Sequence, residues 1–189
     1  GWRQRSAAGR WQSNRAWMAD ASMSFRVGGL RFTRALLVLL WLAVLSSTAF
    51  AEDMCATDSV HLRGDWGTAR FTIELADEPE ERAQGLMHRE SMPRSAGMLF
   101  AYPEPRAIHF WMRNTLIPLD MIFLDKAGVV QKVHSNAQPL DETPIFGGNN
   151  IKYVLEVNGG LSERLGIAPG TQLRHPVIES DVAAWPCDG

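Results

Sequence analysis

Histidine and cysteine are scarce in this chain, with five and two among 189 residues. No histidine has the His-x-x-x-His spacing of a zinc site, and no Cys-x-x-Cys pair is present for metal or redox chemistry. The Gly-x-Ser-x-Gly, phosphate-loop and dinucleotide-binding fingerprints are absent as well. We therefore predict no metal site, and no standard catalytic motif points to a reaction.

Acidic residues are almost missing from the first 51 residues, which hold seven arginines and a single acid, Asp20. Residues 52–189 have the opposite balance, with twelve Lys or Arg against twenty Asp or Glu. Two different kinds of polypeptide are therefore joined near residue 51. Because nucleic-acid phosphates require a basic protein surface, we expect no nucleic-acid partner for the acidic part.

The first 51 residues have the pattern of an export signal. Residues 35–45 read ALLVLLWLAVL, follow three arginines and lead into a small-residue exit that ends in Ala-x-Ala at Ala51. This pattern predicts a secretory signal peptide that is cleaved after Ala51. The alternative is an uncleaved membrane anchor, but a bilayer span needs about 20 apolar residues and this core is shorter. We expect a periplasmic or secreted protein without a stable membrane span after cleavage.

The expected mature chain is residues 52–189, which is large enough to form one domain with its own core. The sequence opens with Gly1, and Met18 and Met23 are both candidate starts, so residues 1–17 are a candidate start-site artefact. No lipobox cysteine follows the apolar core.

The two cysteines lie near the ends of the expected mature chain, at Cys55 and Cys187. In an oxidising compartment such a pair normally forms a disulfide. A redox or metal-binding pair is the alternative, and it usually has closer spacing. We predict a structural disulfide that joins the two termini.

Short strands dominate the expected secondary structure. Residues 70–75 alternate between apolar and polar, and 120–125 are apolar on both faces, which is typical of a central strand. A turn at 125–128 predicts a hairpin with 129–135. Further strands are expected at 97–102, 108–112, 153–158 and 172–175, with a loop at 136–150.

Two short helices complete the expected pattern. One begins with a capping box of Asp77 and Glu80 and ends at Gly85, and the other covers residues 161–165. We therefore predict a mainly β (β-rich α+β) fold, a sandwich or barrel of short strands with one or two short helices.

Three segments carry a resemblance to a known family. They read FTIELADEPEERAQGLMHRESMPRSAGMLFAYPEP, FWMRNTLIPLDMIFLDKAGVV and YVLEVNGGLSERLGIAPG. In their order and spacing they resemble the family called domain of unknown function 192, over about residues 69–175. The resemblance implies a small β domain similar to a distorted jelly roll, often exported in bacteria, and it implies no activity.

The densest polar segment is residues 111–120. It places Trp111, Arg113, Asn114, Thr115 and Asp120 along one strand-loop-strand connection. An arginine can bind a carboxylate or phosphate bidentately, a tryptophan can stack on a ring, and the other three can hydrogen-bond a ligand. The alternative is structural, since Asn and Thr satisfy turn backbone groups and the aspartate can cap a helix or pair with the arginine.

Strand parity adds three residues to this candidate ligand site. His109 shares a face with Trp111, and Glu156 shares a face with Asn158, opposite the expected core side chains. If the two strands are neighbours, these four side chains line one surface. His109 and Glu156 are then a candidate acid/base pair, provided that they lie within hydrogen-bond distance.

Five methionines offer a cofactor alternative. Thioethers suit Cu(I), although methionine more often fills gaps in a core, and no Met-x-x-Met cluster is present. We expect no cofactor and keep copper as a minor alternative. The five residues are Met87, Met92, Met98, Met112 and Met121.

Three functions remain open from the sequence. We favour an exported small-ligand-binding or accessory protein, because polar and aromatic groups cluster while no catalytic set is present. The alternatives are an enzyme that uses His109, Asp120 or Glu156, and an envelope interaction module without a small ligand. The partner is accordingly a small ligand or an envelope protein.

Overall fold

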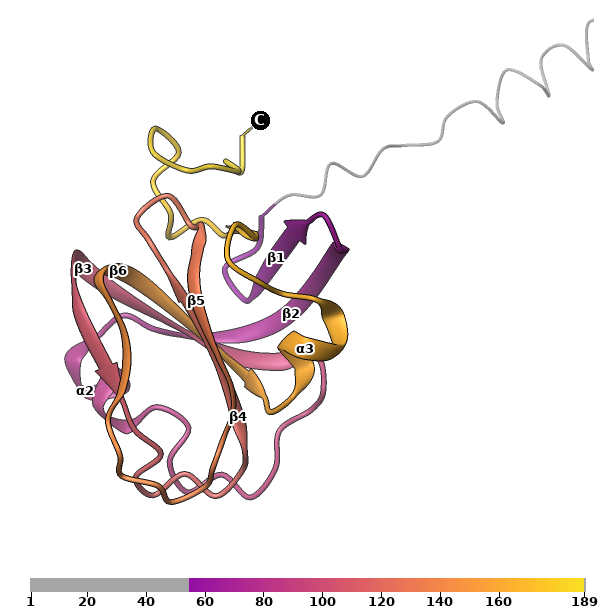
Figure 1. The fold of residues 1–189 in the computed structure, drawn as a ribbon. Helices are drawn as coiled ribbons and strands as arrows, with labels where there is room; N and C mark the ends of the chain where they lie inside the picture. Colours follow the sequence, from indigo (N-terminus) through magenta and orange to yellow (C-terminus); the bar gives the residue numbers. More distant parts are fainter. Residues whose placement is uncertain (1–54, 189) are drawn as a thin grey trace, which may run out of the picture. The chain divides into compact units, whose positions relative to one another are not determined.

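The computed structural model describes residues 55–188, which form seven strands and two short helices (Figure 1). The mainly β class is thus confirmed. The predicted signal peptide and the candidate artefact lie outside the described residues. Within residues 55–188, no helix is long and apolar enough to cross a membrane. The elements are β1 (Ser59–Gly64), β2 (Gly67–Ala76), α2 (Pro79–Gln84), β3 (Ala96–Phe110), β4 (Leu119–Leu124), β5 (Val130–Ala137), β6 (Ile145–Asn158), α3 (Leu161–Leu165) and β7 (Gln172–Arg174).

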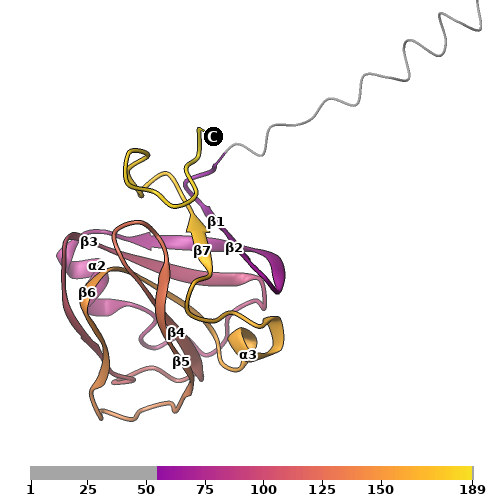
Figure 2. The same cartoon turned by 45° about the horizontal axis from the view of Figure 1, so that its top comes forward.

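The seven strands form one mixed sheet in the order β5-β4-β6-β3-β2-β1-β7. Every neighbouring pair is antiparallel except β2 and β3, which run parallel. Parallel neighbours need a crossover connection, and α2 lies in that connection. The β4–β5 hairpin, which the sequence predicted, occupies one edge, and Figure 2 shows β7 alongside β1 at the other.

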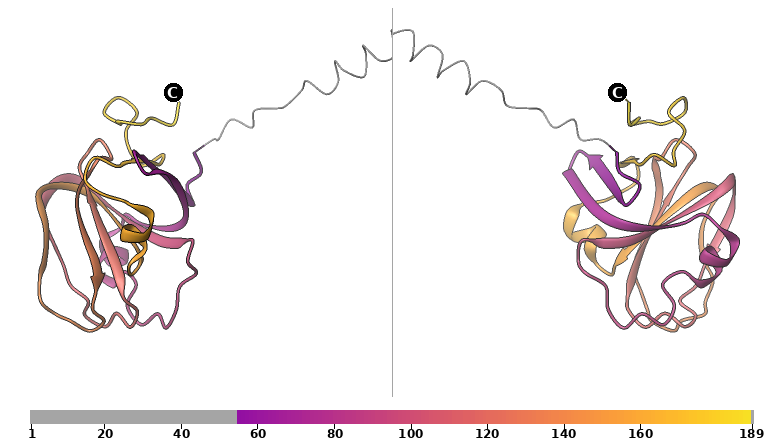
Figure 3. Two further views of the ribbon diagram at one scale, coloured as in Figure 1. Left: turned by 45° about the vertical axis from the view of Figure 1, so that its right-hand side comes forward. Right: turned by 180° about the vertical axis from the view of Figure 1, so that it is seen from behind.

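The sheet curls until its two edges meet at one end (Figure 3). Val129, just before β5, forms an antiparallel bridge with Gln172 of β7. Leu173 N–H also donates to Gly128 O at 2.8 Å. These bonds pair backbone groups that an open edge would leave exposed. The architecture is a half-barrel, which decides between the sandwich and the barrel left open by the sequence.

The central strands are buried on both faces. β4 is buried along its whole length, as its apolar sequence predicted. On β6, Leu155 and Val157 belong to one apolar cluster, while Val154, which precedes Leu155, belongs to another. We call the cluster on the Val154 side the second core. It consists of Ala76, Leu86, Met98, Phe100, Ile108, Met112, Ile117, Leu119, Met121, Phe123, Ala137, Ile151 and Val154.

Two of the predicted strands are in fact one. β3 continues through Pro103 and Pro105, which separated the expected strands 97–102 and 108–112. The register of β3 against β6 shifts between Ala101 and Arg106, so the prolines lie at an irregularity where fewer ladder hydrogen bonds are required. The strand ends at Phe110, and the last two residues of the expected second strand lie beyond it.

The predicted loop at 136–150 was wrong at both ends, since its first two residues belong to β5 and its last six belong to β6. The glycine pair at 147–148 lies in this part of the strand. A Cβ at Gly147 would lie 2.2 Å from Phe123 Cδ1, so glycine at this position lets the strand pack against that ring. β1 was not predicted; it is short, and only Val60 and Leu62 mark its apolar face.

Both predicted helices are present. The capping box of α2 is formed by Glu78 and Glu81, one residue later than Asp77 and Glu80. The helix ends at Gly85, whose φ of 51° favours glycine. The expected helix at 161–165 is α3.

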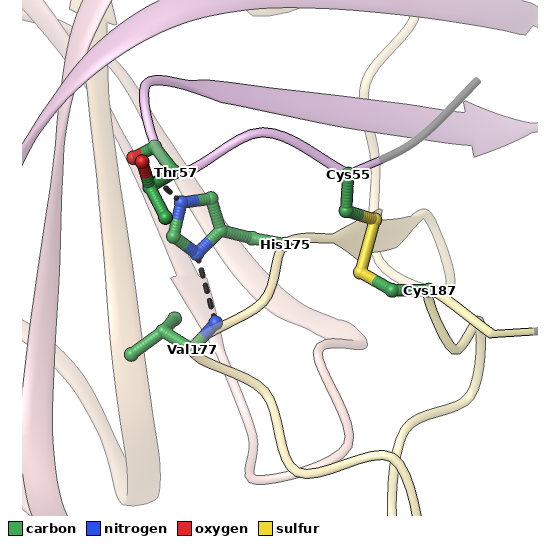
Figure 4. The surroundings of a disulfide bond; sticks show 5 residues. All are labelled: Cys55, Thr57, His175, Val177 and Cys187. Atoms are coloured by element: carbon green, nitrogen blue, oxygen red, sulfur yellow. Dashed lines mark hydrogen bonds between the residues drawn. A yellow bond between two sulfur atoms is a disulfide. The ribbon is translucent and has the colours of Figure 1, made fainter.

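A disulfide joins Cys55 to Cys187, with the two Cα atoms 5.6 Å apart (Figure 4). This confirms the predicted pairing. The buried ring of His175 binds both segments near it: Nε2 donates to Thr57 O at 3.1 Å, and Nδ1 accepts the Val177 N–H at 3.0 Å. The beginning and the end of the described chain are therefore held together by covalent and hydrogen bonds.

Candidate functional site

One pocket of about 100 Å³ lies between α2 with its following loop, β3, the segment after β3, and β6. It contains four of the residues proposed from the sequence, His109, Trp111, Thr115 and Glu156. The other lining residues are Arg82, Ala83, Gln84, Gly85, Leu86, Met87, Phe100, Tyr102 and Phe110.

Glu156 is the buried acid of this pocket, with 4% of its surface exposed. In the sheet it lies between Met98 of β3 and Met121 of β4, which are its partners across the two neighbouring strands. Within residues 55–188, no side chain or backbone N–H donates a hydrogen bond to its carboxyl group. Burial alone therefore acts on it and raises the pKa of Glu156 to about 8.

Aromatic side chains form much of the remaining wall. Phe100, Tyr102 and Phe110 come from β3, and Phe100 and Phe110 pack edge to face with ring centroids 5.1 Å apart. Trp111 follows β3 and is 47% exposed, so it stands at the rim. The pocket therefore combines apolar ring surfaces with one buried carboxyl group.

Arg82 of α2 is the cation of the pocket lining. Its guanidinium donates to Asp77 O and, at 3.0 Å, to Ala101 O, and it lies 5.2 Å from the Tyr102 ring centroid. Burial raises the pKa of Tyr102, and the charges of Arg82 and Arg106 oppose that rise. Arg82 is thus already bound to two carbonyl groups and one ring.

His109 lies on the pocket without bonding to Glu156. β3 and β6 are neighbours, as the parity hypothesis required, but the register pairs His109 with Phe146 and Glu156 with Met98. The His109 ring packs on Phe146 with centroids 4.8 Å apart. Among the described residues, no hydrogen bond connects His109 to Glu156, so the two share a pocket and are not a bonded pair.

Arg113 and Asn114 form the turn beside the pocket and do not line it. Arg113 lies over the Trp111 ring at 5.6 Å and accepts the Thr115 hydroxyl on its carbonyl oxygen at 3.3 Å. Asn114 has a φ of 55°, and its carbonyl accepts the His88 N–H at 2.8 Å. The turn chemistry proposed as the alternative thus accounts for Asn114 and Thr115.

Asp120 lies away from the pocket and is completely buried. Its Oδ1 accepts the N–H groups of Asn136 and Gly160, both at 2.7 Å. Its Oδ2 accepts the N–H and the hydroxyl of Ser162. The carboxylate caps α3 and does not bind Arg113, so of the two structural roles proposed for it the structure has the capping role.

Asn158 also binds backbone groups. Its side-chain amide donates to Met92 O at 3.3 Å and to Pro93 O at 2.9 Å, which connects the end of β6 to the loop before β3. The sequence missed Arg82, Phe100 and Tyr102. Strand parity could have found the two aromatic residues, since both alternate with Leu99 and Ala101, whereas nothing in the sequence marks Arg82.

Three of the five methionines proposed for copper, Met98, Met112 and Met121, are buried in the second core. Met92 packs against this core, and Met87 lines the pocket. Within residues 55–188, no group of three His, Cys, Asp or Glu side chains is arranged to hold a metal ion. Core packing accounts for the three buried methionines.

The comparison with family models matches residues 60–175 to the model for DUF192, described as Uncharacterized ACR. The chain belongs to the domain of unknown function 192 family. The DUF192 region contains every residue that lines the pocket. A comparison with curated proteins finds no match.

Two solved structures are similar to the chain, each with a TM-score of 0.60. One is a protein of unknown function from Novosphingobium aromaticivorans DSM 12444, 43% identical, with 61% of this chain and 82% of that chain covered. The other, from Sinorhizobium meliloti 1021, is described as a candidate transcription regulator and is 42% identical, with 64% of this chain and 94% of that chain covered. Neither description names a ligand.

Proposed function

We propose that this DUF192 protein is an exported small-ligand-binding or accessory protein, and that the pocket around Glu156 is its binding site. The observation that carries the proposal is the buried carboxyl group without a hydrogen-bond donor. Burial disfavours the charged form of Glu156, and titratable groups with strongly shifted pKa values are concentrated at functional sites. A ligand that donates hydrogen bonds to Glu156 would stabilise the charged form that burial disfavours.

The shape and lining of the pocket suit a small molecule. Binding sites are typically concave and mostly apolar, with a few polar groups that fix the orientation of the ligand. Here aromatic rings supply the apolar surface, while Glu156, Thr115 and His109 supply the polar groups. With about 100 Å³ of space, the pocket fits a group of a few heavy atoms.

Export remains part of the proposal. Its support is the signal-peptide pattern of residues 1–51 together with the Cys55–Cys187 disulfide, which is typical of an oxidising compartment. A periplasmic or secreted location follows. We carry no nucleic-acid role over from the Sinorhizobium relative, because residues 52–189 are acidic.

Native mass spectrometry of the purified chain tests the proposal. We expect a stoichiometric extra mass that is lost in Glu156→Gln and retained in Glu142→Gln, which changes an exposed carboxyl group outside the pocket. A chain that carries no ligand and binds none from a small-molecule extract would contradict it. An envelope interaction module, with exposed Trp111, Leu116 and Leu140 as contacts, would then be favoured.

A second candidate is an enzyme, because Glu156 and His109 line the same pocket. With a pKa of about 8, Glu156 is mainly protonated at neutral pH and can serve as a general acid. A bell-shaped pH dependence of kcat/KM on any substrate, with the limb near pH 8 lost in Glu156→Gln, would favour this function over simple binding.

A further inference from the structure

The unpartnered acid and the rings around it restrict the class of ligand. Glu156 is the only carboxylic acid among the residues that line the pocket. Its neighbours across the sheet, Met98 and Met121, bring no hydrogen-bond donor. A ligand must therefore supply donors to Glu156 while its remaining atoms contact Phe100, Tyr102 and Trp111.

None of the other charged or titratable residues that line the pocket donates a hydrogen bond to Glu156. From α2 comes Arg82, whose guanidinium is bound to two carbonyl groups and lies over Tyr102. From β3 come Tyr102 and His109, and His109 packs on Phe146. The loop after α2 and the segment after β3 contribute Met87 and Thr115, and β4 contributes no charge opposite Glu156.

We propose that the pocket binds a small primary ammonium ion, with its N–H groups on the Glu156 carboxylate and its carbon chain against the aromatic rings. This inference rests on the proposed ligand-binding function and names the class of ligand. Charge-assisted hydrogen bonds to a carboxylate are stronger than neutral ones, and aromatic faces attract a cation. An anionic ligand would be repelled by the carboxylate form of Glu156 and could bind only beside the protonated form.

Binding of an ammonium ion requires the carboxylate form of Glu156. At neutral pH the free site holds a proton, so one proton passes to the solvent as the ligand binds, and the ligand keeps all three of its N–H groups. With a pKa of about 8 for Glu156, affinity for a cation rises roughly tenfold per pH unit below pH 8 and then levels off. A neutral ligand that accepts a hydrogen bond from protonated Glu156 would bind with nearly constant affinity below pH 8 and more weakly above it.

Three probes of matched chain length separate these cases: n-butylamine, n-butanol and butyrate. Titration calorimetry at pH 6 and pH 7, in two buffers of different ionisation enthalpy, measures both affinity and proton release. We expect n-butylamine to bind more tightly than the other two, with nearly one proton released and roughly tenfold higher affinity at pH 7 than at pH 6. In Glu156→Gln, amine affinity should fall at least tenfold, while Glu142→Gln should match the parent protein.

Equal binding of n-butanol and n-butylamine without proton release would overturn the ammonium assignment and leave the small-ligand function standing. Preferred binding of butyrate would overturn it in the same way. Failure of all three probes would also reject the assignment. The proposed function fails separately, when native mass spectrometry finds neither a retained nor a captured ligand.

Discussion

Oδ2 of Asp120 accepts two hydrogen bonds from Ser162, one from the backbone N–H at 2.6 Å and one from the hydroxyl group at 2.7 Å. Together with the two bonds to Oδ1, they connect the start of β4 to the end of β5 and to the first turn of α3. A completely buried carboxylate with four donors is well satisfied. Asp120 therefore has a structural role, although it lies in segment 111–120, which the sequence indicated as a candidate ligand site.

Replacing Asp120 by Asn should destabilise the protein. An amide can keep the bonds on one oxygen only, and its NH₂ group would face N–H donors at the other position. We expect a loss of about 2–4 kcal/mol in the free energy of unfolding, measured by urea denaturation. Asp181→Asn, at an exposed position, serves as the control and should change stability little. Unchanged stability in Asp120→Asn would show that these bonds contribute little.

Glu156 should make stability fall as the pH rises. Its pKa is about 8 in the folded protein, whereas the unfolded chain has the ordinary value of 4.5. Between these two values the folded state holds a proton that the unfolded state has lost, so the free energy of unfolding decreases as pH increases. Above pH 8 the accumulated loss is on the order of 4–5 kcal/mol.

The comparison of Glu156→Gln with the parent protein isolates this effect. Near pH 4.5 the two should be similarly stable, and at pH 8 the variant should be more stable by several kcal/mol. Urea denaturation at intervals across this range measures the difference. Two parallel stability curves would mean that Glu156 titrates near its ordinary pKa when folded.

Loss of the disulfide should lower the melting temperature. Cys55 and Cys187 are separated by 132 residues, and in the chain-entropy model closing a loop of this length contributes roughly 5 kcal/mol, often less in practice. The double variant Cys55→Ala/Cys187→Ala should therefore melt several degrees lower than the parent. Reductant should lower the melting temperature of the parent and leave the variant unchanged. Equal melting temperatures for both proteins would contradict a stabilising role.

His175 should make the protein sensitive to acid. Burial lowers its pKa, and the bond to Thr57 opposes this only in part. Because the Val177 N–H donates to Nδ1, the folded state needs the neutral ring. Its contribution to stability is therefore present above about pH 6.5 and decreases as the pH falls through the lower folded pKa.

The variant His175→Gln measures this contribution. Its deficit in the free energy of unfolding relative to the parent should narrow between pH 7 and pH 5. NMR titration of the His175 ring gives its folded pKa directly. A deficit that stays constant over this range, or a ring that titrates above pH 6.5, would refute the depressed pKa.

Much of the fold could be read from local patterns. The apolar alternation of residues 70–75 and the fully apolar 120–125 indicated β2 and β4, because strand side chains point to opposite faces with a period of two. The turn at 125–128 predicted the hairpin, and Gly85 predicted the end of α2. The sequence did not predict that β3 continues through Pro103 and Pro105, because a register irregularity depends on the partner strand.

By itself, the sequence determined the positions of most strands, the DUF192 membership and the cysteine pair, because each depends on spacing along the chain. The tertiary structure decided which polar residues meet. Asp120 accepts hydrogen bonds from residues as distant in sequence as Ser162 and is structural. Glu156 lies between β3 and β4, largely buried, on the wall of the pocket. Burial and hydrogen bonding arise from segments distant in sequence, so only the folded chain separates a structural carboxylate from a candidate binding group.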